Sequence, residues 1–286
     1  MIHTIIPVHN RLDFTKKCLN SLKRQKNFKE LNIILVDDGS TDGTSQYVKK
    51  KFPKVTILSG NGNLFWGGAV NIGIRYALDI GSSKDWVLLL NNDIELSSDA
   101  IKKLVKTSNI KKRKALVASL TVCFDDKKTL IKSGTIVKSW FLNITHHPYV
   151  GKNIQQIFNK NPIKVDLLTA RCLLHPIEIF KRIGNYDAKN FPHYGGDDDF
   201  SIRASKINYS KYICPESIIY LKLDKNNSIN KKNLKYFIKI ILSKKSSSNL
   251  KDKLNFTIKC VPIYAMISFF LIGVLKSFLL SFKKIN

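Results

Sequence analysis

Three short apolar segments of this chain end in side chains that bind ligands readily. The segments are HTIIPV, NIILV and WVLLL, and the polar residues that follow them are His9-Asn10, Asp37-Asp38 and Asn91-Asn92-Asp93. A short apolar run bounded by polar residues predicts a strand that is buried on both faces. Amides and carboxylates at the end of such a strand are costly unless something binds them. Together the clusters predict one ligand site, although each alone is also typical of an ordinary turn.

A nucleoside-diphosphate sugar would use all three clusters. A carboxylate at Asp37 or Asp38 can accept hydrogen bonds from a base or from ribose hydroxyls. Asp93, with help from Asn91, offers the oxygen ligands that Mg²⁺ or Mn²⁺ prefers. Such a cation neutralises a diphosphate and stabilises it as a leaving group. We therefore predict a divalent cation as the cofactor.

Two further segments contribute candidate residues. The loop NGNLFWGG precedes a predicted helix, and Gly67 and Gly68 allow a ligand to approach the backbone closely. Trp66 fits either a platform for a sugar ring or a core residue packed on its own helix. The segment FPHYGGDDDF places three aspartates at the start of another helix, directly after His193 and Tyr194. Aspartates at the start of a helix are typical capping residues.

Strands and helices alternate along the first half of the chain. The predicted strands are residues 3–8, the run that begins at 32, 55–58, 86–90 and 115–122, and the helices between them include 42–51 and 69–81. The second half is less regular and includes a helix predicted to start at Pro176. Alternation of short buried strands with helices predicts an α/β protein, with a Rossmann-like, mostly parallel central sheet and helices on both faces.

The length and composition bound the domain organisation. The chain has 286 residues, of which 44% are hydrophobic, enough for one large domain or two small ones. We predict a catalytic domain over 1–224, with a nucleotide-sugar half over about 1–125 and an acceptor half over about 126–224. A basic and apolar helical extension is predicted over 225–286.

The net charge of +27 requires an explanation, because such a surface attracts anionic partners. Residues 222–286 contain 14 lysines and two acidic residues, and the stretch 261–275 within them is uncharged. This stretch is shorter than the roughly 18 residues of a confident spanning helix. It predicts a helix lying on an anionic membrane surface, with a spanning helix or a helix packed on the protein as alternatives. A nucleic-acid partner is not expected, because it gives no reason for the acidic strand ends.

The cysteines and the N-terminus indicate the compartment. None of the five cysteines forms a CxxC pair, which favours reduced thiols in a cytosolic protein. The N-terminal residues MIHTIIPVHNR do not read as a signal peptide. We expect a protein at the cytoplasmic face of the cell membrane, bound peripherally or monotopically.

The motifs IIPVHNR, IILVDDGSTDGT, WVLLLNNDIEL and HYGGDDDFSIRA, in this order, resemble those of the inverting family 2 glycosyltransferases with the GT-A fold. The resemblance covers about residues 1–215. It is especially close to bacterial rhamnosyltransferase-like members through NGNLFWGGAVNIGI and FPHYGGDDDFSIRA.

The resemblance implies a role for each group of residues. Donor binding is implied for Pro7, His9, Asn10, Asp37, Asp38, Gly67, Gly68, Asn71, Asn92 and Asp93. Metal binding is implied for Asp93 and Asn91, and Asp197 is implied as the catalytic base. Contact with the acceptor is implied for Trp66, His193, Tyr194 and Asp198.

The chain departs from the family pattern at three points. Asn91-Asn92-Asp93 has one carboxylate fewer than the Asp-x-Asp element of the family. The usual Glu before the base is replaced by Gly196. No histidine follows His193, where family members often have a further metal ligand, and only Asp224 could stand in for it.

The implied activity is transfer of a sugar from a UDP- or dTDP-sugar to a glycan or lipid-linked acceptor, with inversion. The implied setting is synthesis of a bacterial cell-surface polysaccharide such as a capsule, an O-antigen or a cell wall. One alternative is a nucleotidyltransferase that makes an activated sugar. That class carries a Gly-rich, basic phosphate loop after its first strand, which PVHNRLDF is not. Another alternative is an inactive nucleotide- or glycan-binding module.

Overall fold

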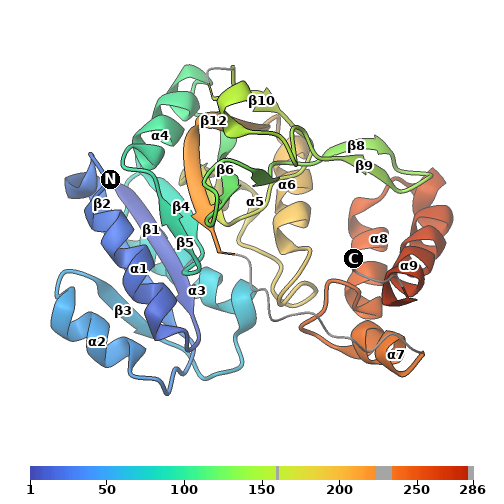
Figure 1. Cartoon of the computed structure of the whole chain (residues 1–286), viewed down its shortest axis with the longest axis horizontal. Helices are drawn as coiled ribbons and strands as arrows, with labels where there is room; N and C mark the ends of the chain where they lie inside the picture. The colour runs from blue at the N-terminus through green and yellow to red at the C-terminus, as the bar shows by residue number, and fades with distance from the viewer. Residues whose placement is uncertain (159–160, 223–233, 283–286) are drawn as a thin grey trace.

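A mixed sheet with helices on both faces forms the centre of the molecule, and three C-terminal helices lie to one side of it (Figure 1). The computed structural model describes residues 1–158, 161–222 and 234–282. The α/β class predicted from the sequence is confirmed. The predicted boundary between 224 and 225 lies outside the described residues and stays a prediction.

The central sheet has ten strands. They are β1 (Ile2–Val8), β2 (Leu31–Asp37), β3 (Thr56–Ser59), β4 (Trp86–Leu90), β5 (Ile94–Leu96), β6 (Ala115–Cys123), β7 (Leu130–Lys132), β10 (Ile163–Lys164), β11 (Cys172–Pro176) and β12 (Ser210–Leu221). Their order is β10-β12-β6-β11-β4-β1-β2-β3, with β5 paired to β12 and β7 to β6. Because β11 runs antiparallel to both β4 and β6, the strands β12, β6, β4, β1, β2 and β3 all point in one direction.

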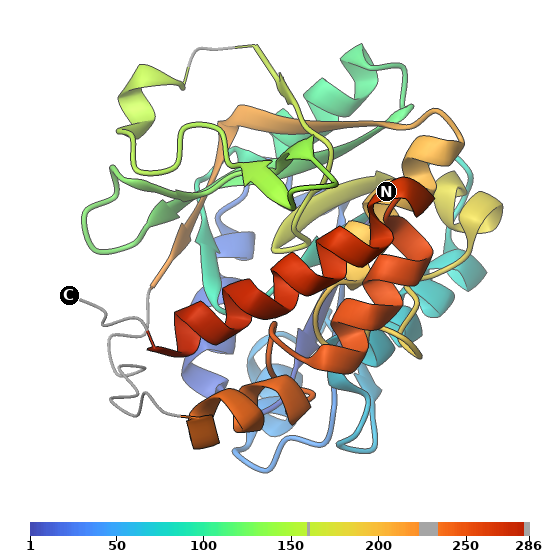
Figure 2. The same cartoon turned by 90° about the vertical axis from the view of Figure 1, so that its right-hand side faces the viewer.

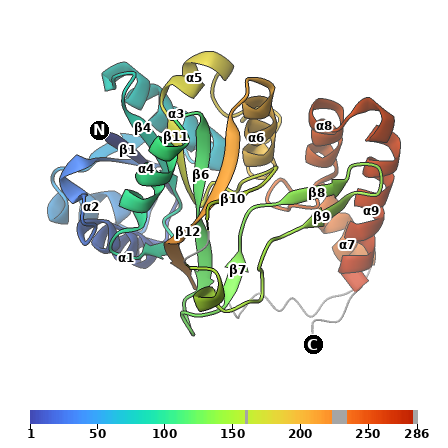
Figure 3. The same ribbon diagram turned by 90° about the horizontal axis from the view of Figure 1, so that it is seen from above.

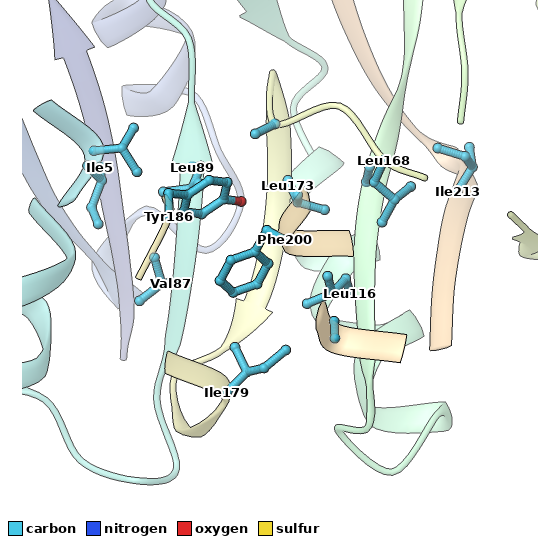
Figure 4. Close-up of a cluster of buried hydrophobic side chains, with 14 of the residues drawn as sticks. Ile5, Val87, Leu89, Leu116, Leu168, Leu173, Ile179, Tyr186, Phe200 and Ile213 are labelled. Carbon is cyan, nitrogen blue, oxygen red and sulfur yellow. The ribbon is translucent and has the colours of Figure 1, made fainter. Parts of the chain in front are cut away.

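One face of the sheet is covered by α3 (Phe65–Ile80), α5 (Glu178–Ile183) and α6 (Gly196–Lys206). The buried side chains between these helices and the sheet include Tyr186 and Phe200 (Figure 4). Their rings stack with centroids 4.5 Å apart and an interplanar angle of 10°. This packing holds α6 against the sheet, and α6 carries the three consecutive aspartates.

The other face is covered by α1 (Leu12–Lys23), α2 (Thr44–Lys51) and α4 (Ala100–Ile110). In α1 the residues Cys18, Leu19 and Leu22 recur at helical spacing and are fully buried. Leu104 of α4 and Val48 of α2 complete this second core. Short 3₁₀ turns occur at Phe28–Glu30, Ile154–Gln156 and Ile263–Ala265.

The C-terminal region consists of α7 (Leu234–Leu242), α8 (Leu250–Cys260) and α9 (Met266–Phe282). A hairpin of β8 (Ile136–Ser139) and β9 (Ile144–His146) reaches from the central body to these helices (Figure 3). The Trp140 ring beside this hairpin lies 5.8 Å from the ring of Phe269. The Asn143 amide donates to the Phe269 carbonyl oxygen at 3.3 Å. The hairpin therefore anchors α9, which runs across the face shown in Figure 2.

Helix α8 is also fastened to the segment that precedes and begins α6. The Lys259 ammonium lies 3.0 Å from the Asp187 carboxylate, and the Asn255 amide donates to the Asn190 carbonyl oxygen at 3.2 Å. The Cys260 thiol donates to Asp199 at 3.7 Å. These contacts connect the C-terminal helices to the aspartate-bearing helix.

Several element boundaries differ from the sequence-based expectation. Pro176 ends β11, and helix α5 begins at Glu178 rather than at Pro176. Helix α3 begins at Phe65 rather than at 69, so Gly67 and Gly68 lie in its first turn and not in a loop. The uncharged stretch 261–275 belongs to a longer helical segment, Ile263–Phe282, which is long and apolar enough to cross a membrane. Lys276 lies within that segment, so the uncharged stretch alone underestimated its length.

Candidate active site

A cavity of about 1000 Å³ opens where the carboxyl ends of β1, β2 and β4 meet the start of α6. Val8 and Asp37 are register partners at the ends of β1 and β2, so the first two polar clusters lie side by side. The cavity continues to α8 and α9, which supply Phe256 and Phe269 to its lining. Its size is typical of ligand sites, and it joins the predicted donor residues to the predicted base.

Asp38 and His9 form one end of this cavity. Both oxygens of the buried Asp38 carboxylate accept backbone hydrogen bonds, from Gly62 N at 2.7 Å and Leu64 N at 3.0 Å. The His9 ring nitrogen Nδ1 lies 2.6 Å from the Asp38 carbonyl oxygen. Asp38 therefore fixes the loop before α3 at the cavity edge, and Pro7 lies beside it in the lining.

Five predicted donor residues lie outside the lining that the described residues form. They are Asn10, Asp37, Gly67, Gly68 and Asn71. The Asp37 carboxylate accepts hydrogen bonds from Ser40 N and the Ser45 hydroxyl, so it holds its own turn. A Cβ atom at Gly67 would meet the Phe191 carbonyl oxygen at 3.1 Å. That glycine allows α3 to approach the loop before α6.

The side chains of Asn10 and Asn71 also hold backbone segments in place near the cavity. The Asn10 side-chain oxygen accepts from Thr41 N at 2.9 Å, which joins the loops after β1 and β2. The Asn71 amide exchanges two hydrogen bonds with the backbone of Tyr186, at 2.8 and 3.1 Å. Their visible contacts position the walls of the cavity.

The three residues after β4 differ in how their side chains are used. The Asn91 oxygen accepts from the Trp66 indole N–H at 3.1 Å, and the Asn92 amide donates to the Thr15 hydroxyl at 3.0 Å. The Asp93 oxygen Oδ1 is buried and has no hydrogen-bond partner among the described residues. Its Oδ2 lies 3.7 Å from a guanidinium nitrogen of Arg11 and 3.7 Å from one of Arg171.

The unpartnered oxygen of Asp93 is the observation that fits a divalent cation. No group of three or more His, Cys, Asp or Glu side chains suited to a metal occurs among the described residues. Mg²⁺ typically takes one or two protein carboxylates and completes its shell with substrate phosphates and water. Asp93, with the Asn91 oxygen beside it, fits a cation held mainly by a diphosphate. Asp224, the alternative third ligand, lies outside the described residues.

Arg11 and Arg171 were not predicted as a pair. Arg11 caps α1 in a left-handed conformation with φ 65°, and Asn10 before it has φ 57°. Non-glycine residues adopt this region rarely, and such strain gathers at functional sites. Arg11 directly follows His9-Asn10 and Arg171 lies just before β11, but only the folded chain brings both guanidinium groups to Asp93.

Helix α6 begins at Gly196, after Gly195 in a left-handed conformation, and its first turn carries the three aspartates. Asp197 and Asp198 line the cavity. The Asp197 oxygen Oδ2 accepts from Ala170 N at 3.2 Å. Asp199 faces elsewhere: it is buried and accepts from the Arg203 guanidinium at 2.8 Å. Of the three aspartates of α6, two therefore line the cavity.

Burial sets the protonation of these two carboxyl groups. It raises the pKa of Asp197, while hydrogen bonds from backbone N–H groups and the charge of Lys132 oppose the rise. Burial and the adjacent charge of Asp197 raise the pKa of Asp198 well above its usual value. The pair therefore retains one proton to a higher pH than isolated aspartates would, with Asp197 as the more readily ionised member.

Trp66, His193 and Tyr194 all line the cavity. The Trp66 indole also packs edge-on against Tyr186, with centroids 5.4 Å apart, so it belongs to both core and site. The His193 Nδ1 atom is buried without a partner among the described residues. Burial and the nearby charges of Lys245 and Arg11 lower the pKa of His193, which keeps the ring neutral at neutral pH.

The far wall of the cavity comes from the C-terminal region and was missed by sequence reasoning. Its lining residues include Lys245, Asp252, Lys253, Phe256, Phe269 and Phe270. The basic and apolar composition favoured a membrane contact for this region, with packing on the protein as one alternative. No local signal in the sequence shows that α8 and α9 return to the strand ends.

Comparison with known proteins gives a consistent result. The family model described as "Glycosyl transferase family 2" matches residues 4–171. The N-acetylglucosaminyl-diphospho-decaprenol L-rhamnosyltransferase of Mycobacterium tuberculosis is 27% identical over 210 residues, which are 67% of this chain and 67% of that protein.

Two solved structures share the fold. The crystal structure of GalNAc-T7 with UDP, GalNAc and Mn²⁺ has a TM-score of 0.66 at 15% identity, covering 90% of this chain and 48% of that one. This chain thus spans about half the length of that protein. The mannosyltransferase PcManGT from Pyrobaculum calidifontis, in complex with GDP-Man and Mn²⁺, has a TM-score of 0.63 at 12% identity, covering 98% and 72%. The GT-A fold expected from the motifs is confirmed.

Proposed function

The chain belongs to glycosyl transferase family 2, and from this premise we propose that it transfers a sugar from a UDP- or dTDP-sugar to a glycan or lipid-linked acceptor with inversion. One observation carries the proposal: Asp93, at the end of β4, and Asp197, at the start of α6, face the same cavity. A donor diphosphate at Asp93 and an acceptor hydroxyl at Asp197 would place the reacting atoms between them.

Asp197 is the proposed general base. It accepts the proton of the acceptor hydroxyl while that oxygen attacks the anomeric carbon, and the bond from that carbon to the diphosphate breaks on the opposite face. The hydrogen bond from Ala170 N fixes the orientation of the Asp197 carboxylate. Burial raises the pKa of both Asp197 and Asp198, and the backbone hydrogen bonds to Asp197 favour its ionised form.

The donor end needs positive charge, because the leaving diphosphate gains charge as the bond breaks. Arg11 and Arg171 supply two guanidinium groups beside Asp93, and guanidinium groups pair well with phosphate oxygens. A divalent cation bound at Asp93 would supply Lewis-acid stabilisation of the same diphosphate. Asp38 and His9, which also line the cavity, are the proposed contacts for the nucleoside.

Helix α9 supports a membrane setting. Along α9 the exposed residues Ile267, Leu271, Leu275 and Leu279 recur every four positions. Ile267, for example, is 79% exposed. An exposed apolar stripe among many lysines suits the surface of an anionic bilayer. We place the protein at the cytoplasmic face of the membrane, in synthesis of a cell-surface polysaccharide, where acceptors on lipid carriers are within reach.

The test is a donor panel. Purified full-length protein in detergent is incubated with nucleotide-sugars and Mn²⁺ or Mg²⁺, with a synthetic N-acetylglucosaminyl-diphospho-prenol as acceptor. We expect one donor to release its nucleoside diphosphate and to yield a product of inverted anomeric configuration. Binding of UDP without turnover of any donor would instead indicate an inactive binding module. Release of diphosphate from a nucleoside triphosphate and a sugar phosphate would indicate a nucleotidyltransferase.

A further inference from the structure

Lys253 is a cation of the cavity lining. Its side chain is half-buried, lines the cavity from α8, and forms no ion pair or hydrogen bond with the described part of the chain. Burial and the like charge of Lys276 lower the pKa of Lys253. A partly desolvated ammonium group without a partner is unfavourable, so an anion beside it would restore the charge balance.

The surroundings of Lys253 are more basic than acidic. Lys276 of α9 donates to the Asn143 carbonyl oxygen, and Asn143 also lines the cavity. Lys245 lines the same side and lies near enough to His193 to lower its pKa. The carboxyl group on this wall is that of Asp252, and burial raises its pKa. Asp252 Oδ2 has no hydrogen-bond partner among the described residues, so this carboxyl group can accept a hydrogen bond from a ligand hydroxyl.

Aromatic side chains continue from this basic patch toward the exterior. Phe256, Phe269 and Phe270 line the cavity next to the lysines. Trp140 packs against Phe256 and Phe269, with centroids 6.5 and 5.8 Å away. The helix that carries Phe269 and Phe270 exposes its apolar stripe on the outside. A ligand with an anionic head and an apolar chain matches this sequence of surfaces.

We propose that Lys253, supported by Lys276 and Lys245, binds the phosphate or diphosphate group that joins the acceptor sugar to its lipid. This proposal rests on the proposed function and names the part of the acceptor that the enzyme recognises. Ammonium groups bind phosphate oxygens through charge-assisted hydrogen bonds. The donor diphosphate has separate cations, Arg11 and Arg171 at Asp93, which come from other segments of the cavity lining than Lys253 on α8.

The test measures binding of a prenyl diphosphate with the donor site filled. Full-length protein in nonionic detergent, saturated with UDP and Mn²⁺, is titrated calorimetrically with farnesyl diphosphate and with farnesol as the neutral match. We expect farnesyl diphosphate to bind more tightly than farnesol, and Lys253→Gln to weaken that binding by about tenfold or more. Lys251→Gln, on the same helix but exposed and outside the cavity lining, is expected to bind like the wild type.

A Lys253→Arg variant separates loss of charge from loss of fold, because it keeps the cation. It is expected to retain most of the affinity, and circular dichroism and Tm report whether each variant folds. Equal affinity of the wild type and Lys253→Gln for farnesyl diphosphate would overturn the proposal. So would a wild type that does not distinguish farnesyl diphosphate from farnesol.

The phosphate of a bilayer lipid is the competing source, and vesicles distinguish it. Sedimentation with phosphatidylcholine vesicles, with and without phosphatidylglycerol, is measured for Lys253→Gln and Lys251→Gln. If Lys253→Gln and Lys251→Gln lose vesicle binding equally and only slightly, the result supports an acceptor site. A loss confined to Lys253→Gln, with farnesyl diphosphate binding intact, overturns it in favour of a headgroup contact. Wild-type donor turnover without selective farnesyl diphosphate binding refutes this site alone, whereas selective binding without turnover of any donor refutes the proposed function alone.

Discussion

Replacing Asp197 by asparagine is expected to remove the general base while leaving the cavity intact. The amide has the shape of the carboxyl group, and its oxygen can still accept the hydrogen bond that Ala170 N now donates at 3.2 Å. What is lost is the ability to accept a proton. Asp197→Asn therefore tests the chemistry rather than the fold.

The neighbouring carboxyl group sets the size of the effect. General bases contribute typically about 10²–10⁴-fold to the rate. Asp198 lines the same cavity, but burial, which raises its pKa, persists when Asp197 is replaced, so Asp198 is a poor substitute for the base. We therefore expect a loss of kcat in the upper part of that range, about 10³–10⁴-fold, or roughly 4–5.5 kcal/mol in activation free energy.

Asp198→Asn is the matched control, because it replaces the adjacent side chain in the same helical turn. It leaves the Asp197 carboxylate and its hydrogen bond from Ala170 N in place, so the loss of kcat should stay below about tenfold. The assay follows release of nucleoside diphosphate from the donor that the wild type turns over, with saturating acceptor. Donor and acceptor affinities are measured alongside and are expected to change little in Asp197→Asn.

The pH dependence gives an independent check with a definite sign. A raised pKa means that Asp197 binds a proton at a higher pH than an ordinary aspartate, so wild-type activity should fall as the pH drops through that raised value. The acid limb should persist in Asp198→Asn and disappear from the residual rate of Asp197→Asn. The assignment is refuted if Asp198→Asn loses the larger factor, or if Asp197→Asn keeps more than about a tenth of the wild-type kcat.

Three further predictions concern the metal, the membrane and the core. Asp93→Ala is expected to raise the Mn²⁺ concentration needed for half-maximal turnover, because the unpartnered oxygen is lost; an unchanged metal titration would contradict this. Ile267→Lys combined with Leu271→Lys should lower the affinity for anionic vesicles by at least about tenfold, since two exposed apolar side chains are removed. The control is Ile110→Lys on α4, where the side chain is 62% exposed, and this variant should bind the vesicles no less tightly than the wild type. Phe200→Ala should cost about 3–5 kcal/mol of unfolding free energy, measured by urea titration, and a cost below about 1 kcal/mol would mean that the stack with Tyr186 does not hold α6.

The sequence predicted that the polar strand ends lie together because the signal for each of them is local. An apolar run that ends in amides or carboxylates marks both a buried strand and the end at which ligands bind, and parallel strands bring such ends together. Val8 and Asp37 are accordingly register partners. The same reasoning could not separate Asp37 from Asp38. Only the folded loops show that Asp37 holds its own turn while Asp38 lines the cavity.

The features that were missed depend on contacts distant in sequence. Gly67 and Gly68 suggested a loop that a ligand approaches closely, but they lie in the first turn of α3, where a Cβ atom at Gly67 would meet Ala188 and the backbone at Phe191. Arg171 lies just before β11, far from Asp93 in the sequence, yet its guanidinium pairs with the Asp93 carboxylate. Lys253 lies on α8, which composition alone placed in a separate extension. Periodicity shows which face of a helix is apolar, but it does not show what that face packs against.

The attachment of α8 to the catalytic segment has a practical consequence for anyone who shortens this chain. A fragment ending near residue 222 would remove the exposed apolar stripe and would be easier to handle. It would also expose Phe191, which packs against Phe256, and would leave Asp187 without Lys259. Because α8 and α9 contribute to the lining of the cavity, the site in the fragment would be more open. Acceptor selectivity measured on such a fragment would lack the contribution of α8 and α9 to the cavity lining. Screening for inhibitors should therefore use the chain with both helices present.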